Sequence, residues 1–165
     1  WWMSFHWWVL WVIIAMILFA KKYRINFYSL SDEVTAILPI WLGLGRIWNY
    51  INWELLWYSW YTWLLAVYKD WVWYFPSPLL EALLEWLVLF IILNLVYKKK
   101  RFAWQIASLF LILYWVFRLF VEIFFSSPDS HIWYIMWYFT MWEILTLPMI
   151  IWGIYFYNKL KSWQK

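Results

Sequence analysis

Long apolar runs constrain this chain more than any other feature of its sequence. Four of them, at 3–20, 82–97, 104–125 and 138–157, are close to the length of about 17–25 residues that a helix needs to cross a bilayer. A shorter run at 33–45 completes a crossing if the helix tilts or extends into the polar stretch that follows. The composition agrees, because 68% of the 165 residues are hydrophobic and only 13% are charged. The sequence therefore predicts an all-α, polytopic transmembrane helix bundle with about five spans.

Lys and Arg gather in short connections between these runs. The clusters follow the first, third and fifth runs and consist of Lys21, Lys22 and Arg24; Lys98, Lys99, Lys100 and Arg101; and Lys159, Lys161 and Lys165. If five spans alternate, all three clusters fall on one side, which the positive-inside rule assigns to the cytoplasm. We therefore expect one transmembrane domain over 1–165, with an aromatic-rich inserted element at 46–80 on the outer face.

Composition also excludes several classes of function. The net charge of +4 comes from these clusters rather than from one basic face, so the chain is not expected to bind nucleic acid. The absence of cysteine removes disulfides, thiolate metal sites and cysteine nucleophiles. The sequence contains no Gly-rich phosphate loop, no paired metal-ligand spacing and no Gly-x-Ser-x-Gly elbow. We expect neither a cofactor nor a metal.

Ionisable residues inside the apolar runs are candidates for function, because each is costly in lipid. Tyr114, Arg118 and Glu122 are spaced four residues apart and share one helix face. Arg118 and Glu122 can neutralise each other, either in a functional site or as a buried pair that only fixes helix register. Glu81 and Glu85 form a second pair on one face, and carboxylates at a helix N-terminus are a simpler interpretation of at least one of them.

The polar stretch 45–54 follows the short apolar run directly and contains Arg46, Asn49, Asn52 and Glu54. In the expected topology it lies near the outer headgroups, as does His6, a candidate base in the first run. A lone histidine at an interface is also commonly just a hydrogen-bonded side chain. Arginine forks suit phosphate oxygens, so these residues together favour chemistry on an anionic phospholipid.

The stretch 45–55 resembles the signature of bacterial prolipoprotein diacylglyceryl transferases, which runs Gly-Arg-x-Gly-Asn-Phe-Ile-Asn-Gly-Glu. Other segments resemble further family motifs in the right order. They are 3–8, Pro76-Ser77 with 79–86, Tyr114-Trp115 with Arg118 and Glu122, Pro128-Asp129, 141–143 and 147–149. The resemblance covers nearly the whole chain.

The resemblance implies a seven-helix enzyme of the bacterial plasma (inner) membrane. Such an enzyme transfers the diacylglyceryl group of phosphatidylglycerol to the lipobox cysteine of prolipoprotein signal peptides and releases glycerol phosphate. It implies that Arg46 and Arg118 hold the phosphate and that His6 is the candidate base for the incoming thiol. The residues implied in substrate binding and positioning are Asn49, Asn52, Glu54, Tyr114 and Glu122.

Departures from the family pattern accompany the match. The arginine that usually follows the Glu122 position is missing, and Phe75, Pro78 and Leu80 replace a His, a Gln and a Tyr. The chain opens on Trp1-Trp2 and lacks counterparts of the first two family helices. We therefore expect a chain missing its true start, and a polypeptide that is inactive by itself.

Tryptophan stands where the family pattern has glycine at nine positions: Trp7, Trp8, Trp48, Trp53, Trp57, Trp86, Trp115, Trp133 and Trp142. Glycine permits positive φ and close helix approach, and tryptophan permits neither well. The sequence holds 21 Trp and 3 Gly. Our hypothesis is that a reassigned stop codon meaning glycine was translated as tryptophan. The alternative is a protein truly rich in Trp at membrane interfaces.

Two other functions remain open from the residues alone. In a membrane transporter, Arg118 and Glu122 would line a pathway; in a non-catalytic membrane assembly protein, the ion pairs would only set packing. A transporter is expected to show internal repeats or interrupted helices around a midplane site. Neither is evident in this sequence.

Overall fold

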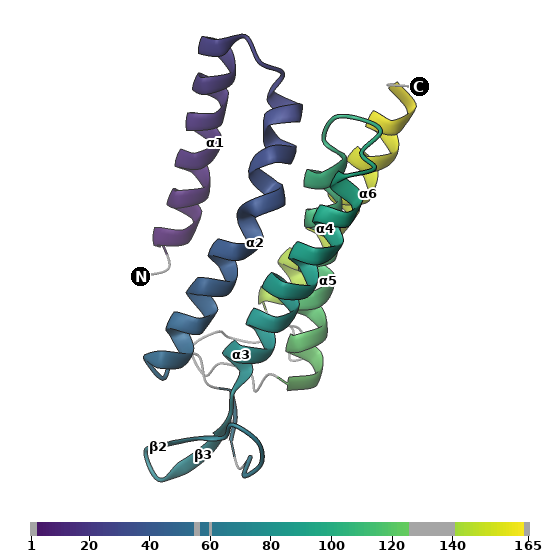
Figure 1. Ribbon diagram of the computed structural model, residues 1–165. Coiled ribbons are helices and arrows are strands. Elements are labelled where there is room, and N and C mark those ends of the chain that lie inside the picture. Colours follow the sequence, from purple (N-terminus) through teal and green to yellow (C-terminus); the bar gives the residue numbers. More distant parts are fainter. Residues whose placement is uncertain (1–2, 55–56, 60, 126–140, 164–165) are drawn as a thin grey trace.

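The computed structural model describes residues 3–54, 57–59, 61–125 and 141–163, and most of them are helical (Figure 1). The helices are α1 (Met3–Tyr23), α2 (Phe27–Ile51), α3 (Ser77–Glu81), the π-helical η1 (Ala82–Val88), α4 (Leu89–Tyr97), α5 (Gln105–Phe125) and α6 (Met141–Trp163). A helix overlaps each of the five apolar runs, so the prediction of a mostly helical fold is confirmed. The number of membrane spans stays a prediction.

The segments α3, η1 and α4 form one continuous helix over Ser77–Tyr97. In the described part of the chain, it is the one helix long and apolar enough to cross a membrane, with 21 residues and a mean hydropathy of 2.3. It begins after Pro76 and carries Pro78 in its first turn, where proline's missing N–H costs no helical hydrogen bond. A shorter apolar helix covers Gln105–Val121.

Three short strands lie between α2 and α3, so the prediction of an all-α fold is corrected to a mostly helical fold with a small sheet. They are β1 (Trp57–Ser59), β2 (Val67–Lys69) and β3 (Val72–Phe75), paired antiparallel in the order β1-β3-β2. The sheet projects from one end of the helices (Figure 1). The helices on either side extend into 46–80, since α2 ends at Ile51 and α3 begins at Ser77.

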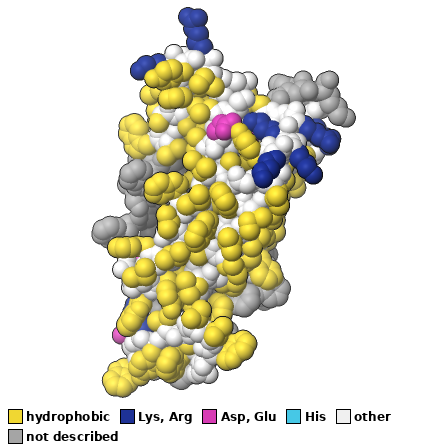
Figure 2. Space-filling model, in the orientation of Figure 1, with side chains coloured by type: hydrophobic (Ala, Val, Ile, Leu, Met, Phe, Trp, Pro, Cys, Tyr) yellow, Lys and Arg dark blue, Asp and Glu magenta, His cyan; other side chains and the backbone are white. Residues whose placement is uncertain are grey.

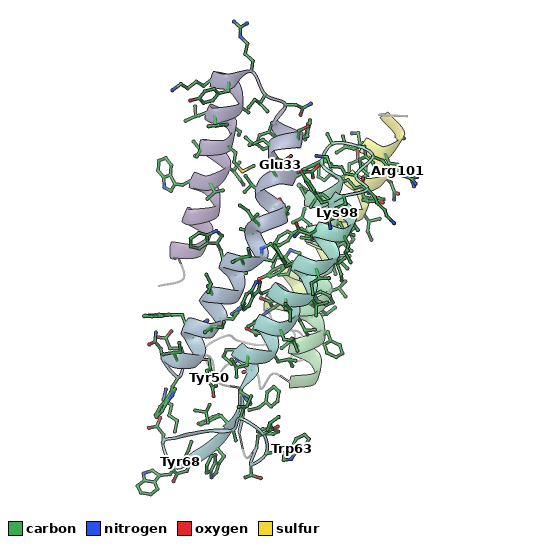
Figure 3. All side chains as sticks on the ribbon, viewed as in Figure 1. Glu33, Tyr50, Trp63, Tyr68, Lys98 and Arg101 are labelled. Atoms are coloured by element: carbon green, nitrogen blue, oxygen red, sulfur yellow. The ribbon has the colours of Figure 1, made fainter. Side chains whose placement is uncertain are left out.

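The two ends of the molecule differ in charge. Figure 2 shows dark blue Lys and Arg side chains gathered at the end away from the sheet, above a largely hydrophobic flank. In Figure 3, Lys98 and Arg101 lie at that end, whereas Trp63 and Tyr68 lie on the sheet side. Large apolar side chains point outward along the helices between the ends, among them Trp41, Trp11 and Trp152. This is the surface that a lipid-facing helix presents.

A small core joins α2, α4 and α5. Ala36, Leu89, Leu93 and Ile106 are buried together, and partly buried residues of α4 and α5 pack around them. Asn94 of α4 donates from Nδ2 to the carbonyl of Ala36 at 3.2 Å, which ties a polar side chain across the same contact. The core therefore holds α5 against α2 through apolar packing.

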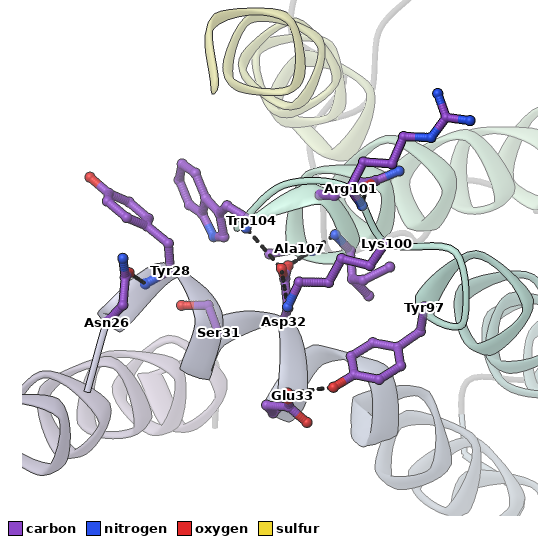
Figure 4. Close-up of polar contacts among 12 residues, drawn as sticks. Asn26, Tyr28, Ser31, Asp32, Glu33, Tyr97, Lys100, Arg101, Trp104 and Ala107 are labelled. Carbon is purple, nitrogen blue, oxygen red and sulfur yellow. Dashed lines mark hydrogen bonds and ion pairs between the residues drawn. The ribbon is translucent and has the colours of Figure 1, made fainter. Parts of the chain in front are cut away.

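Asp32 of α2 caps the N-terminus of α5 from outside (Figure 4). Its fully buried carboxylate accepts the backbone N–H groups of Trp104, Ile106 and Ala107 at 2.8–2.9 Å, and it pairs with Lys100 Nζ at 3.1 Å. The first N–H groups of a helix have no partner within the helix, so a carboxylate there is well stabilised. Asp32 thus fixes the position of α5 relative to α2.

The backbones of α2 and η1 cross closely at Gly43. A Cβ atom placed on Gly43 would lie 2.3 Å from Cβ of Trp86, a separation that real side chains do not tolerate. Gly43 is therefore required at this crossing as long as residue 86 is anything other than glycine, because every other residue has a Cβ atom at that place.

Candidate active site

Arg46 and Arg118 meet at one carboxylate, although they lie on different helices and 72 positions apart in the sequence (118 − 46). Arg46 Nη1 lies 3.0 Å from Glu81 Oε2, and Arg118 Nη1 donates to Glu81 Oε1. Arg46 Nε also donates to Glu85 Oε2 at 3.3 Å. We call Arg46, Glu81, Glu85 and Arg118 the arginine–glutamate cluster.

Three helical segments build this cluster. Arg46 stands near the C-terminal end of α2, Glu81 and Glu85 lie one helical turn apart at the start of the Ser77–Tyr97 helix, and Arg118 lies in α5. Residues four apart share a helix face, so both carboxylates face the same region. Because α2 packs against α3 and η1 and α3 packs against α5, the two arginines reach the carboxylates from two different helices.

Burial of the cluster is uneven. The side chains of Glu85 and Glu81 are 0% and 3% exposed and that of Arg118 is 7% exposed, whereas 19% of Arg46 is accessible. Buried charges need partners, and two glutamates balance two arginines here. Access from outside is therefore greatest at Arg46.

One atom of the cluster is still available to a donor. Within the described residues, Glu85 Oε1 is buried and has no hydrogen-bond partner, while both oxygens of Glu81 are engaged. Tyr114, one turn before Arg118 on α5, lies within electrostatic range of Glu85 and Arg46. The cluster thus offers guanidinium donors and a carboxylate acceptor side by side.

The structure places some of the predicted site residues in the cluster and leaves the roles of others untested. The structure brings Arg46, Arg118 and Tyr114 together. His6 and Glu122 lie in described helices, but their side chains fall outside the described part of the structure, so their roles stay predictions. Arg118 pairs with Glu81, a partner that the sequence analysis did not name.

Three further candidate residues, Asn49, Asn52 and Glu54, lie at or just beyond the C-terminal end of α2. Glu54 donates its N–H to the carbonyl of Asn49 at 2.8 Å, and Asn52 caps the helix. Asn52 and Glu54 are exposed. Among the described residues, the side-chain hydrogen bonds and ion pairs of Arg46 go to Glu81 and Glu85, and the substrate-binding roles of Asn49, Asn52 and Glu54 stay predictions.

Sequence reasoning missed the role of Glu81 and Glu85 as counter-ions of both arginines. The spacing gave one signal: two carboxylates on one face of an apolar helix require cations. Their burial does not fit a solvated helix start. Nothing in the sequence spacing could assign Glu81 to Arg118, because that contact spans 37 residues and depends on how three helices pack.

Comparison with known proteins identifies the family. Residues 2–158 match the family model described as prolipoprotein diacylglyceryl transferase. The chain belongs to this family. The sequence-based recognition is thus confirmed.

Curated relatives agree. Each of three is named phosphatidylglycerol–prolipoprotein diacylglyceryl transferase. The protein of Idiomarina loihiensis is 41% identical over 161 residues, covering 92% of this chain and 58% of the relative. That of Teredinibacter turnerae is 47% identical, covering 94% and 56%, and that of Rickettsia akari is 43% identical, covering 93% and 61%. The chain therefore spans somewhat more than half the length of these relatives.

Proposed function

We propose that this protein transfers the diacylglyceryl group of phosphatidylglycerol to the cysteine thiol of a prolipoprotein lipobox, with release of glycerol phosphate. One observation supports the proposal most directly: Arg46 and Arg118, from separate helices, both bind Glu81 in a buried cluster whose most accessible side chain is Arg46. The family membership and the names of the relatives support the choice of substrates.

The proposed reaction is a nucleophilic displacement at carbon. The substrate thiol loses its proton to a base, and the thiolate sulfur attacks the glyceryl carbon that carries the phosphate ester. A C–S bond forms, the C–O bond to phosphate breaks, and its electron pair leaves with glycerol phosphate. The nucleophile belongs to the substrate, so the absence of cysteine from this chain does not oppose the reaction.

The arginines hold the phosphate and stabilise the charge that it gains as it leaves. A guanidinium has five N–H donors, and the contacts to Glu81 and Glu85 use only some of those on Arg46. Fixed cations in a site shielded from water stabilise such charge far better than they do in bulk water. Arg46, the more accessible of the two, is the first contact for the incoming phosphate.

The remaining site residues have proposed roles around this centre. His6 is the candidate base for the thiol, and Tyr114 and Glu122 position Arg118. Asn49, Asn52 and Glu54 bind substrate at the end of α2. The headgroup glycerol of phosphatidylglycerol carries hydroxyls that can donate to Glu85 Oε1, the free acceptor of the cluster.

The proposed location is a multi-pass position in the bacterial inner membrane, with membrane lipid around the helices. The basic clusters face the cytoplasm and the 46–80 element, with its sheet, faces outward. This orientation places the arginine–glutamate cluster near the outer headgroups, at the sheet end of α2. A prolipoprotein signal peptide reaches the site from within the membrane.

The test uses the complete reading frame, recoded so that the host inserts glycine wherever the source organism is proposed to do so, in a bacterial host depleted of its own transferase. The expected result is a prolipoprotein whose lipobox peptide gains one diacylglyceryl group, measured by mass spectrometry. Arg118→Ala abolishes the gain. The matched control is Arg101→Ala, because Arg101 is exposed at the opposite end of the molecule (Figure 3), and this variant keeps the gain.

Two results would count against the proposal. One is an unmodified lipobox peptide in a host where the protein is present in the membrane. The other is full modification by the Arg118→Ala variant.

A further inference from the structure

Tryptophan occupies left-handed backbone positions in this chain, and glycine does not. Among the described residues, φ is 57° at Trp53, 66° at Trp71 and 70° at Trp104, whereas no glycine has positive φ. For a residue with a Cβ atom, this region costs roughly 1–2 kcal/mol. Three of the six described non-glycine residues with positive φ are tryptophans, a residue type with no preference for it.

Trp53 stands at the glycine position of a helix-ending motif. Helix α2 ends at Ile51, and Asn52 is its cap. Beyond the cap, Trp53 donates its N–H to the carbonyl of Tyr50 at 3.1 Å, and the N–H of Glu54 bonds to the carbonyl of Asn49 at 2.8 Å. This pair of bonds is the Schellman motif, whose left-handed residue is usually glycine.

Trp71 stands at the glycine position of a two-residue hairpin turn. Lys69 of β2 pairs with Val72 of β3, so only Asp70 and Trp71 connect the strands, with φ of 48° and 66°. Positive φ at both residues defines a type I′ turn, for which Asp-Gly is among the preferred sequences. Trp71 is 89% exposed, and its ring meets that of Tyr68 edge-on at a centroid distance of 6.5 Å, so packing gives little reason for tryptophan there.

Trp104, the residue directly before α5, also has positive φ, but its side chain is packed. Its N–H donates to Asp32 Oδ2, and its ring contacts those of Tyr28 and Phe156 at 5.4 and 4.7 Å. These contacts offset part of the strain. The backbone is nevertheless one that glycine adopts without strain.

We propose that the native protein has glycine at positions 53, 71 and 104. The source organism reads one codon as glycine that is translated as tryptophan in this amino-acid sequence. Position 53 is one of the nine where the family pattern has glycine. Positions 71 and 104 are not among those nine. Their positive φ angles therefore indicate glycine at positions outside the family motifs as well. This inference does not depend on the proposed function.

The decisive experiment is peptide mass spectrometry of the protein isolated from membranes of its source organism. Peptides that cover positions 53, 71 and 104 are expected to carry glycine, a residue far lighter than tryptophan. Tryptophan at any of the three positions would overturn the proposal.

The coding sequence gives a second readout. UGG is the standard tryptophan codon, so the inference predicts a different, shared codon at positions 53, 71 and 104. UGG at these three positions would equally overturn the inference.

Discussion

Glu81 is the residue on which the geometry of the cluster depends. Its two oxygens bind arginines from two different helices, and its side chain is 3% exposed. Removing one member of a buried ionic group leaves charge without compensation, which is far more costly than losing a surface pair. Glu81 therefore sets both the local stability and the spacing of the arginines.

We predict that Glu81→Gln lowers the free energy of unfolding by about 3 kcal/mol, the scale of breaking a buried pair. Thermal unfolding in detergent measures the change. Glu54→Gln is the control, because Glu54 is exposed and such changes stay within about 0.5 kcal/mol. Equal effects of the two substitutions would contradict the bridging role of Glu81.

We predict that Trp71→Gly stabilises the β2–β3 hairpin by about 1 kcal/mol, because the turn then adopts positive φ without strain. Trp73→Gly in the same hairpin is the control and destabilises it, since the ring of Trp73 packs at 5.0 Å from that of Tyr68. Hydrogen–deuterium exchange of the strand amides measures both. Faster exchange in Trp71→Gly than in protein produced with tryptophan at position 71 would show that the turn does not need glycine.

Single residues were partly predictable from the sequence. Arg46 and Arg118 stand out because charge beside or within apolar runs needs a reason, and both reach the cluster. Their shared partner did not stand out, because i, i+4 spacing pairs Arg118 with Glu122 and Glu81 with Glu85. Local spacing describes one helix at a time, while the observed ion pairs join three.

At the scale of elements, Asp32 joins two helices that are distant in sequence. Its carboxylate accepts three N–H groups at the start of α5 and pairs with Lys100. The neighbouring acid, Glu33, instead accepts a hydrogen bond from the hydroxyl of Tyr97 on the outside of the helix (Figure 4). Two adjacent carboxylates thus differ sharply in burial.

We predict that Asp32→Ala destabilises the protein by about 3 kcal/mol, because it removes a helix cap and leaves Lys100 unpaired. Glu33→Gln is the matched control one residue away and costs less than about 1 kcal/mol. Chemical unfolding in detergent measures both. A loss no larger in Asp32→Ala than in Glu33→Gln would contradict the capping role.

The helices were predictable from the length of the apolar runs, because a segment surrounded by lipid must satisfy its backbone hydrogen bonds internally. The extension of α2 through the polar stretch to Ile51 was not predicted, because charged and carboxamide side chains after an apolar run suggest that the helix has ended. The strands were missed because the aromatic residues at 57–75 fit a membrane interface as well as they fit strands.

At the scale of the whole molecule, the two ends are predicted to face opposite sides of the membrane. The 165 residues contain no cysteine, so a single cysteine introduced among them is the one thiol in this part of the protein. We expect Trp63→Cys, on the sheet side, to react with a membrane-impermeant maleimide in intact cells, and Lys98→Cys only after permeabilisation. Both native side chains are exposed. Labelling of both cysteines from the same side would contradict the proposed orientation.

Arg46 and Arg118 are proposed to act together on the phosphate of phosphatidylglycerol. The direct measurement is the rate of glycerol phosphate release by the protein, expressed from its complete reading frame, in phosphatidylglycerol vesicles with a lipobox peptide. We predict that Arg46→Ala and Arg118→Ala each lower kcat/KM at least about 100-fold, as losing a preorganised charge-stabilising group does. Lys98→Ala leaves it unchanged. Release by either arginine variant at the rate of the Lys98→Ala control would contradict the account.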